Sequence, residues 1–179
     1  MLTNAQLQAI KAAVLADGTL ASSWGIGDQN SVIAALNSVD AAYFVWRSSV
    51  PVNEIFDAIV WANLTPVDLP DGTTAWTNRS LACQGKQFNV QTMLTGRDSI
   101  SGSKPNIRAG LQDALTNVPS GAGGATTNAG WAGVKAALTR NATRAEKLLI
   151  SGSGTVGAPA TLVFEGTIGL SDLTAAMAS

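Results

Sequence analysis

The sequence contains no histidine and a single cysteine, and charged residues make up only 13% of its 179 residues. Histidine is the usual general base near neutral pH and the commonest metal ligand. Its absence excludes Ser-His-Asp and Cys-His catalysis and nearly all zinc sites. Cys83 has no partner for an intrachain disulfide, and we expect it to be a small buried side chain. These absences favour a protein that works by surface contact over an enzyme, with no cofactor and no metal.

The low charge also limits the partners of the chain. Its charged fraction of 13% is about half of the roughly 25% that is usual in soluble domains, and its formal net charge is −1. There is thus no overall attraction to nucleic acid or to an anionic membrane, and no apolar run approaches the roughly 20 residues of a membrane span. A surface of uncharged small residues suits a free monomer poorly, so we predict self-assembly.

Apolar residues at helical spacing predict a mainly α-helical protein. Thr3 and Gln6 fit a capping box for a helix over residues 3–16, and Asp28 is expected to cap a second helix after a loop over residues 18–27. The cleanest amphipathic pattern covers residues 52–60, and it predicts the central core helix. Further helices are predicted over residues 78–94, 105–118, 126 or 127 to 138, 143–149 (after a break at Asn141) and 171–177. Thr143 and Glu146 fit a second capping box, at the start of the helix over residues 143–149.

Two internal segments lack helical periodicity. Residues 42–48 are aromatic and β-branched, and we interpret them as extended or irregular. The insert at residues 63–77 contains the turn signal Asp71-Gly72, which fits a short β-hairpin or an irregular loop.

The C-terminal region predicts a single β-strand. Residues 161–166 alternate in polarity, with Leu162 and Phe164 on one face. No hairpin partner adjoins this strand, so it must pair with residues 42–48, with the insert, or with another subunit. We therefore expect a multi-helix bundle over residues 1–151 and a C-terminal docking arm over residues 152–179. Deletion of the arm is expected to abolish docking and leave the helical body folded.

The sequence concentrates positive charge in one region. The basic residues there are Lys135, Arg140, Arg144 and Lys147, and Glu146 is the one acid among them. The cluster fits a solvated helix face, or a surface for an acidic partner or for the nucleic-acid backbone, whose binding would be sensitive to salt. No aromatic residues interleave with it, which argues against a platform that stacks single-stranded bases.

Two other functions remain open from the residues alone. A receptor- or glycan-binding module would use exposed aromatic side chains, for which the candidates are Trp24, Trp46 and Trp76. A histidine-free hydrolase of glycans or peptidoglycan would use an acidic pair, either Glu54 with Asp57 or Asp68 with Asp71. Glu54 and Asp57 also suit the first turn of a helix, where carboxylates interact favourably with the helix dipole.

Five segments together carry a family resemblance: Leu2–Leu7, Val45–Pro51, Lys104–Leu115, Ala142–Leu149 and Ala158–Gly166. They resemble the head–tail adaptors of tailed bacteriophages, also called connector or head-completion proteins, over nearly the whole chain. The resemblance implies helical subunits in a ring, commonly of twelve copies, beneath the portal protein. It also implies a DNA channel through the ring, a terminal segment that extends onto a neighbouring ring, and no enzymatic activity or cofactor.

The resemblance also implies partners and a location. The partners would be further copies of the chain, the portal protein, a tail-proximal neck or terminator protein and, without sequence specificity, DNA, but no membrane. The site would be the neck of the virion, after assembly in the host cytoplasm. The interface candidates are Leu162, Phe164 and Glu165 in the arm and Lys135, Arg140, Arg144 and Lys147 in the basic cluster. A tail terminator, a decoration protein or another minor virion protein is the alternative, and the insert at 63–77 has no assigned role.

Overall fold

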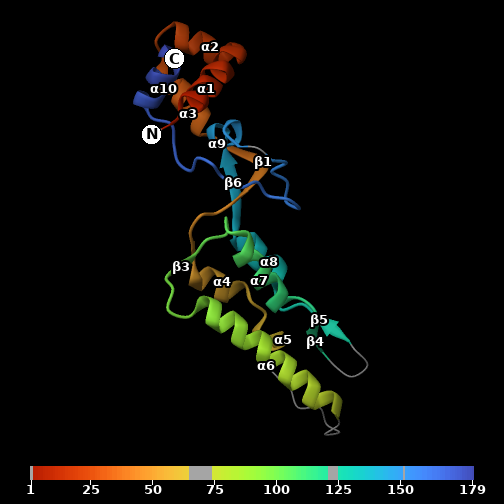
Figure 1. The fold of residues 1–179 in the computed structure, drawn as a ribbon. Helices are drawn as coiled ribbons and strands as arrows, with labels where there is room; N and C mark the ends of the chain where they lie inside the picture. The colour runs from red at the N-terminus through yellow and green to blue at the C-terminus, as the bar shows by residue number, and fades with distance from the viewer. Residues whose placement is uncertain (1, 65–73, 121–124, 151) are drawn as a thin grey trace. The chain divides into compact units, whose positions relative to one another are not determined.

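The computed structural model describes residues 2–64, 74–120, 125–150 and 152–179. The chain divides into two compact units, which we call unit 1 (residues 1–46 and 140–179) and unit 2 (residues 47–139). Among the described residues there are ten helices, which make the chain about 55% helical, and the strands form small two-stranded sheets (Figure 1). The mainly α class predicted from the sequence is confirmed.

Unit 1 is built from both ends of the chain. Its elements are α1 (Asn4–Ala16), α2 (Gly18–Gly25), α3 (Gln29–Asn37), β1 (Val39–Trp46), β6 (Thr139–Thr143, which starts on the last residue of unit 2), α9 (Arg144–Leu148) and α10 (Leu170–Ala178). Helix α1 packs against α2, α9 and α10, and α3 packs against α2, α9 and α10 (Figure 1). The main apolar core of the unit comprises Leu2, Ile10, Val14, Leu20, Val32, Leu36, Ala145, Ile168, Leu173 and Ala176.

Local capping sets the helix starts of unit 1. Thr3 and Gln6 form the predicted capping box of α1, and the Asp28 side chain accepts a hydrogen bond from the backbone N–H of Ser31 at the start of α3. The predicted loop over residues 18–27 is wrong, because α2 begins at Gly18. Asp17 follows the last residue of α1 and caps α2, because its side chain accepts hydrogen bonds from the N–H groups of Thr19 and Leu20.

Two strands pair in unit 1, and one of them was missed from the sequence. Residues 42–48 were expected to be extended or irregular, and β1 ends at Trp46 within this segment. The predicted break at Asn141 is instead the middle of β6, which pairs with β1. A second small core forms on these strands from Tyr43, Val45, Ala142 and Ala160.

The strand predicted over residues 161–166 is not formed. The C-terminal segment meets β1 through an isolated parallel bridge, in which Ala160 pairs with Val45. Beyond it, side chains bind the backbone in place of a neighbouring strand, since Glu146 accepts from the N–H of Gly166 and Asn37 accepts from the N–H of Ile168. The alternation still sets burial, because Leu162 packs on the small core and Phe164 on the main core of unit 1.

Unit 2 is the middle of the chain. Its elements are β2 (Val50–Pro51), α4 (Val52–Ala58), α5 (Trp61–Leu64), α6 (Thr74–Leu94), β3 (Ser99–Ile100), α7 (Pro105–Leu115), β4 (Val118–Pro119), β5 (Thr126–Thr127) and α8 (Trp131–Ala137). β2 pairs antiparallel with β3, and β4 pairs antiparallel with β5. Helix α4 packs on α8, and α6 packs on α5, α7 and β4.

Several boundaries in unit 2 differ from those expected. The pattern over residues 52–60 gives a helix that ends at Ala58, with Ile55 and Ile59 buried but Phe56 and Val60 partly exposed. The helix expected from residue 126 or 127 begins at Trp131. Residues 126–127 form β5 instead, and Gly130 turns the chain into α8 with a φ of 91°.

The arm does not stand apart from the body. Residues 152–179 lie in unit 1, and Ile168, Leu173 and Ala176 are buried in its main core. The two units are therefore defined by contacts between residues far apart in the sequence, and the C-terminal residues belong with the N-terminal helices. Residues 65–73 of the insert at 63–77 lie outside the described residues, and so do the side chains of residues 74–80.

Candidate functional site

The predicted basic cluster is split between the two units. Arg140 lies on β6, and Arg144 and Lys147 lie on α9, all in unit 1. Lys135 lies in the last turn of α8, in unit 2. The three residues of unit 1 share one region with the C-terminal segment, and we describe that region as the candidate site.

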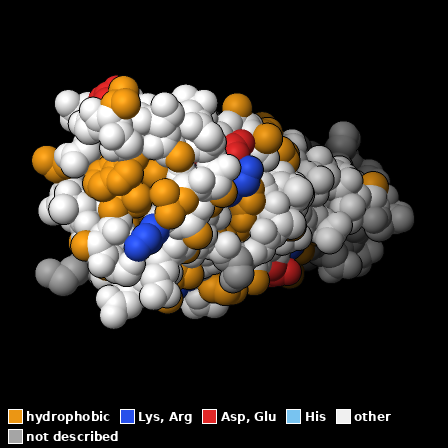
Figure 2. Space-filling model, turned by 90° about the horizontal axis from the view of Figure 1, so that it is seen from above, with side chains coloured by type: hydrophobic (Ala, Val, Ile, Leu, Met, Phe, Trp, Pro, Cys, Tyr) orange, Lys and Arg blue, Asp and Glu red, His pale blue; other side chains and the backbone are white. Residues whose placement is uncertain are grey.

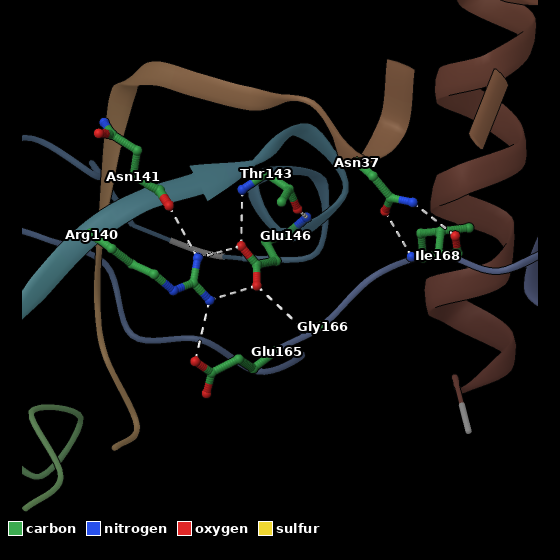
Figure 3. A network of polar contacts seen from close by, with 8 residues as sticks. All are labelled: Asn37, Arg140, Asn141, Thr143, Glu146, Glu165, Gly166 and Ile168. Atoms are coloured by element: carbon green, nitrogen blue, oxygen red, sulfur yellow. Dashed lines mark hydrogen bonds and ion pairs between the residues drawn. The ribbon is translucent and has the colours of Figure 1, made fainter. Parts of the chain in front are cut away.

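Arg140 and Glu146 form the centre of the site (Figure 3). The Arg140 guanidinium donates to both carboxylate oxygens of Glu146, at 2.8 and 2.7 Å, and to Glu165 at 3.2 Å. It also donates to the backbone carbonyl of Asn141 at 3.0 Å. The paired, parallel hydrogen bonds fix the direction of both side chains. Arg140 thus joins β6 and α9 to the C-terminal segment.

Glu146 is the one buried charged residue among the residues that the structure describes, with an exposed fraction of 1%. It closes a capping box at the start of α9, where its carboxylate accepts from the N–H of Thr143 at 2.9 Å. It also accepts from the N–H of Gly166 at 3.2 Å. Burial by itself raises the pKa of Glu146, but the hydrogen bonds from Arg140, Thr143 and Gly166 outweigh it and lower the pKa below its usual range.

The lowered pKa of Glu146 predicts an acid-sensitive fold. A carboxyl whose pKa is lower in the folded than in the unfolded state stabilises the fold above the unfolded value, which is near 4.5. That contribution is lost as the pH falls through the folded value. We expect urea midpoints to be level near neutral pH and to fall below about pH 4.5. In Glu146→Leu the urea midpoint should fall less steeply with decreasing pH. If it falls as steeply as in the wild type, other carboxyls cause the acid sensitivity.

The two other basic residues of unit 1 are also paired with acids. Arg144 donates to Asp17 at 3.1 Å, and Lys147 donates to Asp40 at 2.6 Å. The Lys147 ammonium lies 5.4 Å from the centre of the Tyr43 ring. The hydrogen bonds from Arg144 and Lys147 lower the pKa values of Asp17 and Asp40, respectively.

These pairs correct the picture of a basic patch with one acid. The acids that neutralise it come from more than a hundred residues earlier in the chain (Asp17 and Asp40) or from the C-terminal segment (Glu165). Sequence reasoning therefore missed them. The region is a set of ion pairs, and an acidic partner would have to compete with the carboxylates of Asp17, Asp40, Glu146 and Glu165.

Asn37 holds the C-terminal segment at a second point. The side-chain NH2 group of Asn37 donates to the backbone carbonyl of Ile168 at 2.9 Å, and the side-chain oxygen Oδ1 of Asn37 accepts from the backbone N–H of Ile168 at 2.8 Å (Figure 3). Such a reciprocal pair imitates the backbone pairing of a strand. No signal in the sequence singled out Asn37, because its partner lies 131 positions away.

A hollow of about 420 Å³ lies beside the ion pairs. Its apolar lining comes from Ala13, Leu20, Leu36 and Leu148, and its polar lining from Asp40, Arg144 and Lys147. Figure 2, which is seen from above relative to Figure 1, shows apolar side chains gathered between isolated charged ones. The hollow belongs to unit 1, and its charged groups are those that hold the segments together.

The acidic pairs considered for a hydrolase do not form an acidic pair in the described residues. Glu54 forms an ion pair with Arg47, whose hydrogen bonds lower the pKa of that carboxyl and keep it ionised. Asp57, also on α4, is exposed. Asp68 and Asp71 lie outside the described residues.

Among the aromatic candidates, Trp46 is buried and Trp24 is partly buried against the core of unit 1. The side chain of Trp76 lies outside the described residues. Neither described candidate is an open aromatic platform for a sugar ring.

Three further observations concern ligands and membranes. Cys83 is buried, as expected, and its thiol lies 3.5 Å from the carbonyl oxygen of Pro119. In the described parts of the chain, no group of three His, Cys, Asp or Glu side chains is placed to hold a metal ion. Over the same parts, no helix combines the length and the apolar character needed to cross a membrane.

No protein-family profile, curated protein or solved structure matches this chain.

Proposed function

We propose that this chain is a structural protein of a tailed-phage virion, a head–tail adaptor that forms a ring between portal and tail around the DNA channel. The family resemblance of its five segments suggests the class. The observation that carries the proposal is the way the C-terminal segment lies on β1. An adaptor needs a segment that can dock on a neighbouring subunit. The contacts that attach this segment to β1 could equally be made by the same segment of a neighbouring copy.

The attachment to β1 is mostly backbone hydrogen bonding. The N–H of Trp46 donates to the carbonyl of Ala160 at 3.0 Å, and the N–H of Ala160 donates to the carbonyl of Phe44 at 3.0 Å. The N–H of Phe44 donates to the carbonyl of Gly154. Strand addition uses the same groups whether the added strand belongs to the same chain or to a neighbour. An identical segment from another copy can therefore replace this one without loss of any pairing.

Deletion of residues 152–179 is not a clean test of docking. Ile168, Leu173 and Ala176 are buried in the core of unit 1, so the deletion is expected to expose that core and unfold the unit. The expectation that the helical body stays folded does not fit this packing. Substitutions at the contact with β1 are needed instead.

A pair of cysteines can report which copy supplies the segment. Val45 and Ala160 are bridge partners, so Val45→Cys with Ala160→Cys places two thiols where a disulfide can form. We expect the free subunit to form the bond within one chain. In rings assembled on the portal protein of the same phage, we expect bonds between chains, seen as a ladder on a non-reducing gel.

The single variants Val45→Cys and Ala160→Cys are the matched controls, because neither can form this bond alone. Native mass spectrometry of the wild-type chain, with and without the portal protein, measures ring formation independently. A chain that forms no ring under either condition contradicts the adaptor assignment. Rings whose double variant shows bonds only within chains contradict docking by the arm and leave the ring intact.

A further inference from the structure

The outer face of α6 is unusual for a solvent-exposed helix. From residue 81 onward its exposed residues are all uncharged: Leu81, Ala82, Gln84, Gly85, Phe88, Asn89, Gln91 and Thr92. Leu81 is 62% exposed and Phe88 is 67% exposed. Lys86 is turned toward α7, where its ammonium donates to the carbonyl of Asp113. A helix face that remains in water normally carries charged side chains, so this face is suited to being covered.

Gly85 lies between the two apolar side chains, and no residue that the structure describes requires a glycine there. A Cβ at this position would meet no atom within 4 Å. Glycine within a helix is less stable than alanine, so its presence has a cost that the subunit alone does not offset. Around it lies a shallow, open depression of about 520 Å³, lined only by residues of α6: Leu81, Gln84, Gly85, Gln87, Phe88 and Gln91. The missing side chain leaves room for an incoming one.

We propose that a second copy of this chain covers the face, with two α6 helices packed antiparallel about a two-fold axis beside Gly85. Leu81 and Phe88 are two turns apart, and the midpoint between them adjoins Gly85. An antiparallel pair therefore sets Leu81 of each copy against Phe88 of the other. Each contact occurs twice, which is the requirement for a two-fold interface. The glycines at the crossing let the helices approach closely.

Charge and hydrogen bonding favour a second copy over another partner. From residue 81 onward the face offers no ion to a charged peptide or to a nucleic-acid backbone, and the same residues of a second copy bring no unmatched charge. Its glutamines both donate and accept hydrogen bonds, so the same side chain from another copy satisfies them. Gln84 lies next to the axis and would meet Gln84 of the partner subunit.

This pairing goes beyond the proposed function and does not depend on it. A two-fold contact is complete with two copies, whereas the contacts around a ring join two different surfaces. The α6 pair is thus a form of the free protein, separate from the neighbour contacts of a ring. The docking experiment at Val45 and Ala160 can fail while this one succeeds, and the reverse also holds.

The first test measures mass in solution across a wide range of protein concentrations. We expect the wild-type chain to reach a dimer in sedimentation equilibrium. Phe88→Asp should weaken the pair at least about tenfold, because it places two like charges in the contact. Ile26→Asp is the control, since Ile26 is 80% exposed and lies in unit 1. Circular dichroism confirms that both variants are folded.

A second variant separates pairing from stability. Gly85→Ala removes the cost of a glycine in a helix, so the melting temperature of the monomer should rise by roughly 2 °C. The added methyl group lies at the crossing, so the same variant should dissociate more readily. A glycine with no part in pairing would raise the melting temperature and leave the dissociation constant unchanged.

Single cysteines test the orientation. Gln84→Cys lies next to the axis and should form a disulfide with its counterpart on oxidation. In an antiparallel pair the two copies of residue 91 are displaced along the helices by about 20 Å, which no disulfide spans. Gln91→Cys should therefore remain uncrosslinked, and Cys83 is buried in each case.

Three results from the free protein would overturn the proposal. They are a wild-type chain that stays monomeric at every concentration, a dimer that persists in Phe88→Asp, and crosslinking of Gln91→Cys but not Gln84→Cys. A ring that disassembles in Phe88→Asp would also overturn it, because α6 would then contact a different surface of its neighbour.

Discussion

Glu146→Ala is expected to lower the free energy of unfolding of unit 1 by about 3 kcal/mol. The substitution removes the buried carboxylate that accepts two hydrogen bonds from Arg140 and one each from the N–H groups of Thr143 and Gly166. Arg140 is left beside a cavity with part of its charge unpaired. Because the Arg140 side chain is itself 31% exposed, water compensates in part, and the loss falls at the lower end of the range for buried pairs.

Urea unfolding measures this loss, and hydrogen exchange locates it. Exchange should accelerate in α9 and around residues 166–168, where the network holds the C-terminal segment. Glu165→Ala is the matched control, since Glu165 bonds Arg140 at the exposed edge of the network and should cost less than about 1 kcal/mol. Equal losses in the two variants would contradict the central position given to Glu146.

Gly130→Ala is expected to destabilise unit 2 by about 3 kcal/mol. Gly130 has a φ of 91°, which is unfavourable for any residue with a Cβ. The added Cβ would also fall on the carbonyl oxygen of Ala58 and 2.9 Å from the amide nitrogen of Val60. Both neighbours are backbone atoms, so a rotamer change cannot relieve the clash. The turn into α8 and the end of α4 must move apart.

The clash predicts where unit 2 opens. Hydrogen exchange should accelerate in α4 and α8, and the urea midpoint should fall. Gly18→Ala is the control, because a Cβ at Gly18 meets nothing within 4 Å and its φ is not positive. That variant should be as stable as the wild type or slightly more so. A Gly130→Ala protein with wild-type stability would mean that the approach of α4 to α8 is looser than described.

Locally encoded features were predictable from the sequence. The capping boxes at Thr3 and Thr143 involve side chains three residues from the cap, and both form as expected. The helices that start after Asp28 and at Pro105 also follow from short-range signals. Burial of Cys83 and the mainly α class depend on composition and periodicity, which a single chain reveals directly.

The candidate site was predicted only in part. Arg140, Arg144 and Lys147 were selected by their charge, but the sequence gives no measure of which acids approach them. Asp17 and Asp40 lie 127 and 107 positions from their partners, and no local pattern encodes such a pair. Whether another helix of the same chain covers the outer face of α6 was open until the packing was known.

The sequence by itself determined most of the helices, the two capping boxes and the alternation of burial along the C-terminal segment, because these depend on residues within a few positions of one another. Tertiary structure decided that β6 is a strand, that residues 161–166 are not, and that the ends of the chain share one core. The physical reason is that a backbone group accepts whichever partner the fold brings near. For the N–H groups of Gly166 and Ile168, those partners are the side chains of Glu146 and Asn37.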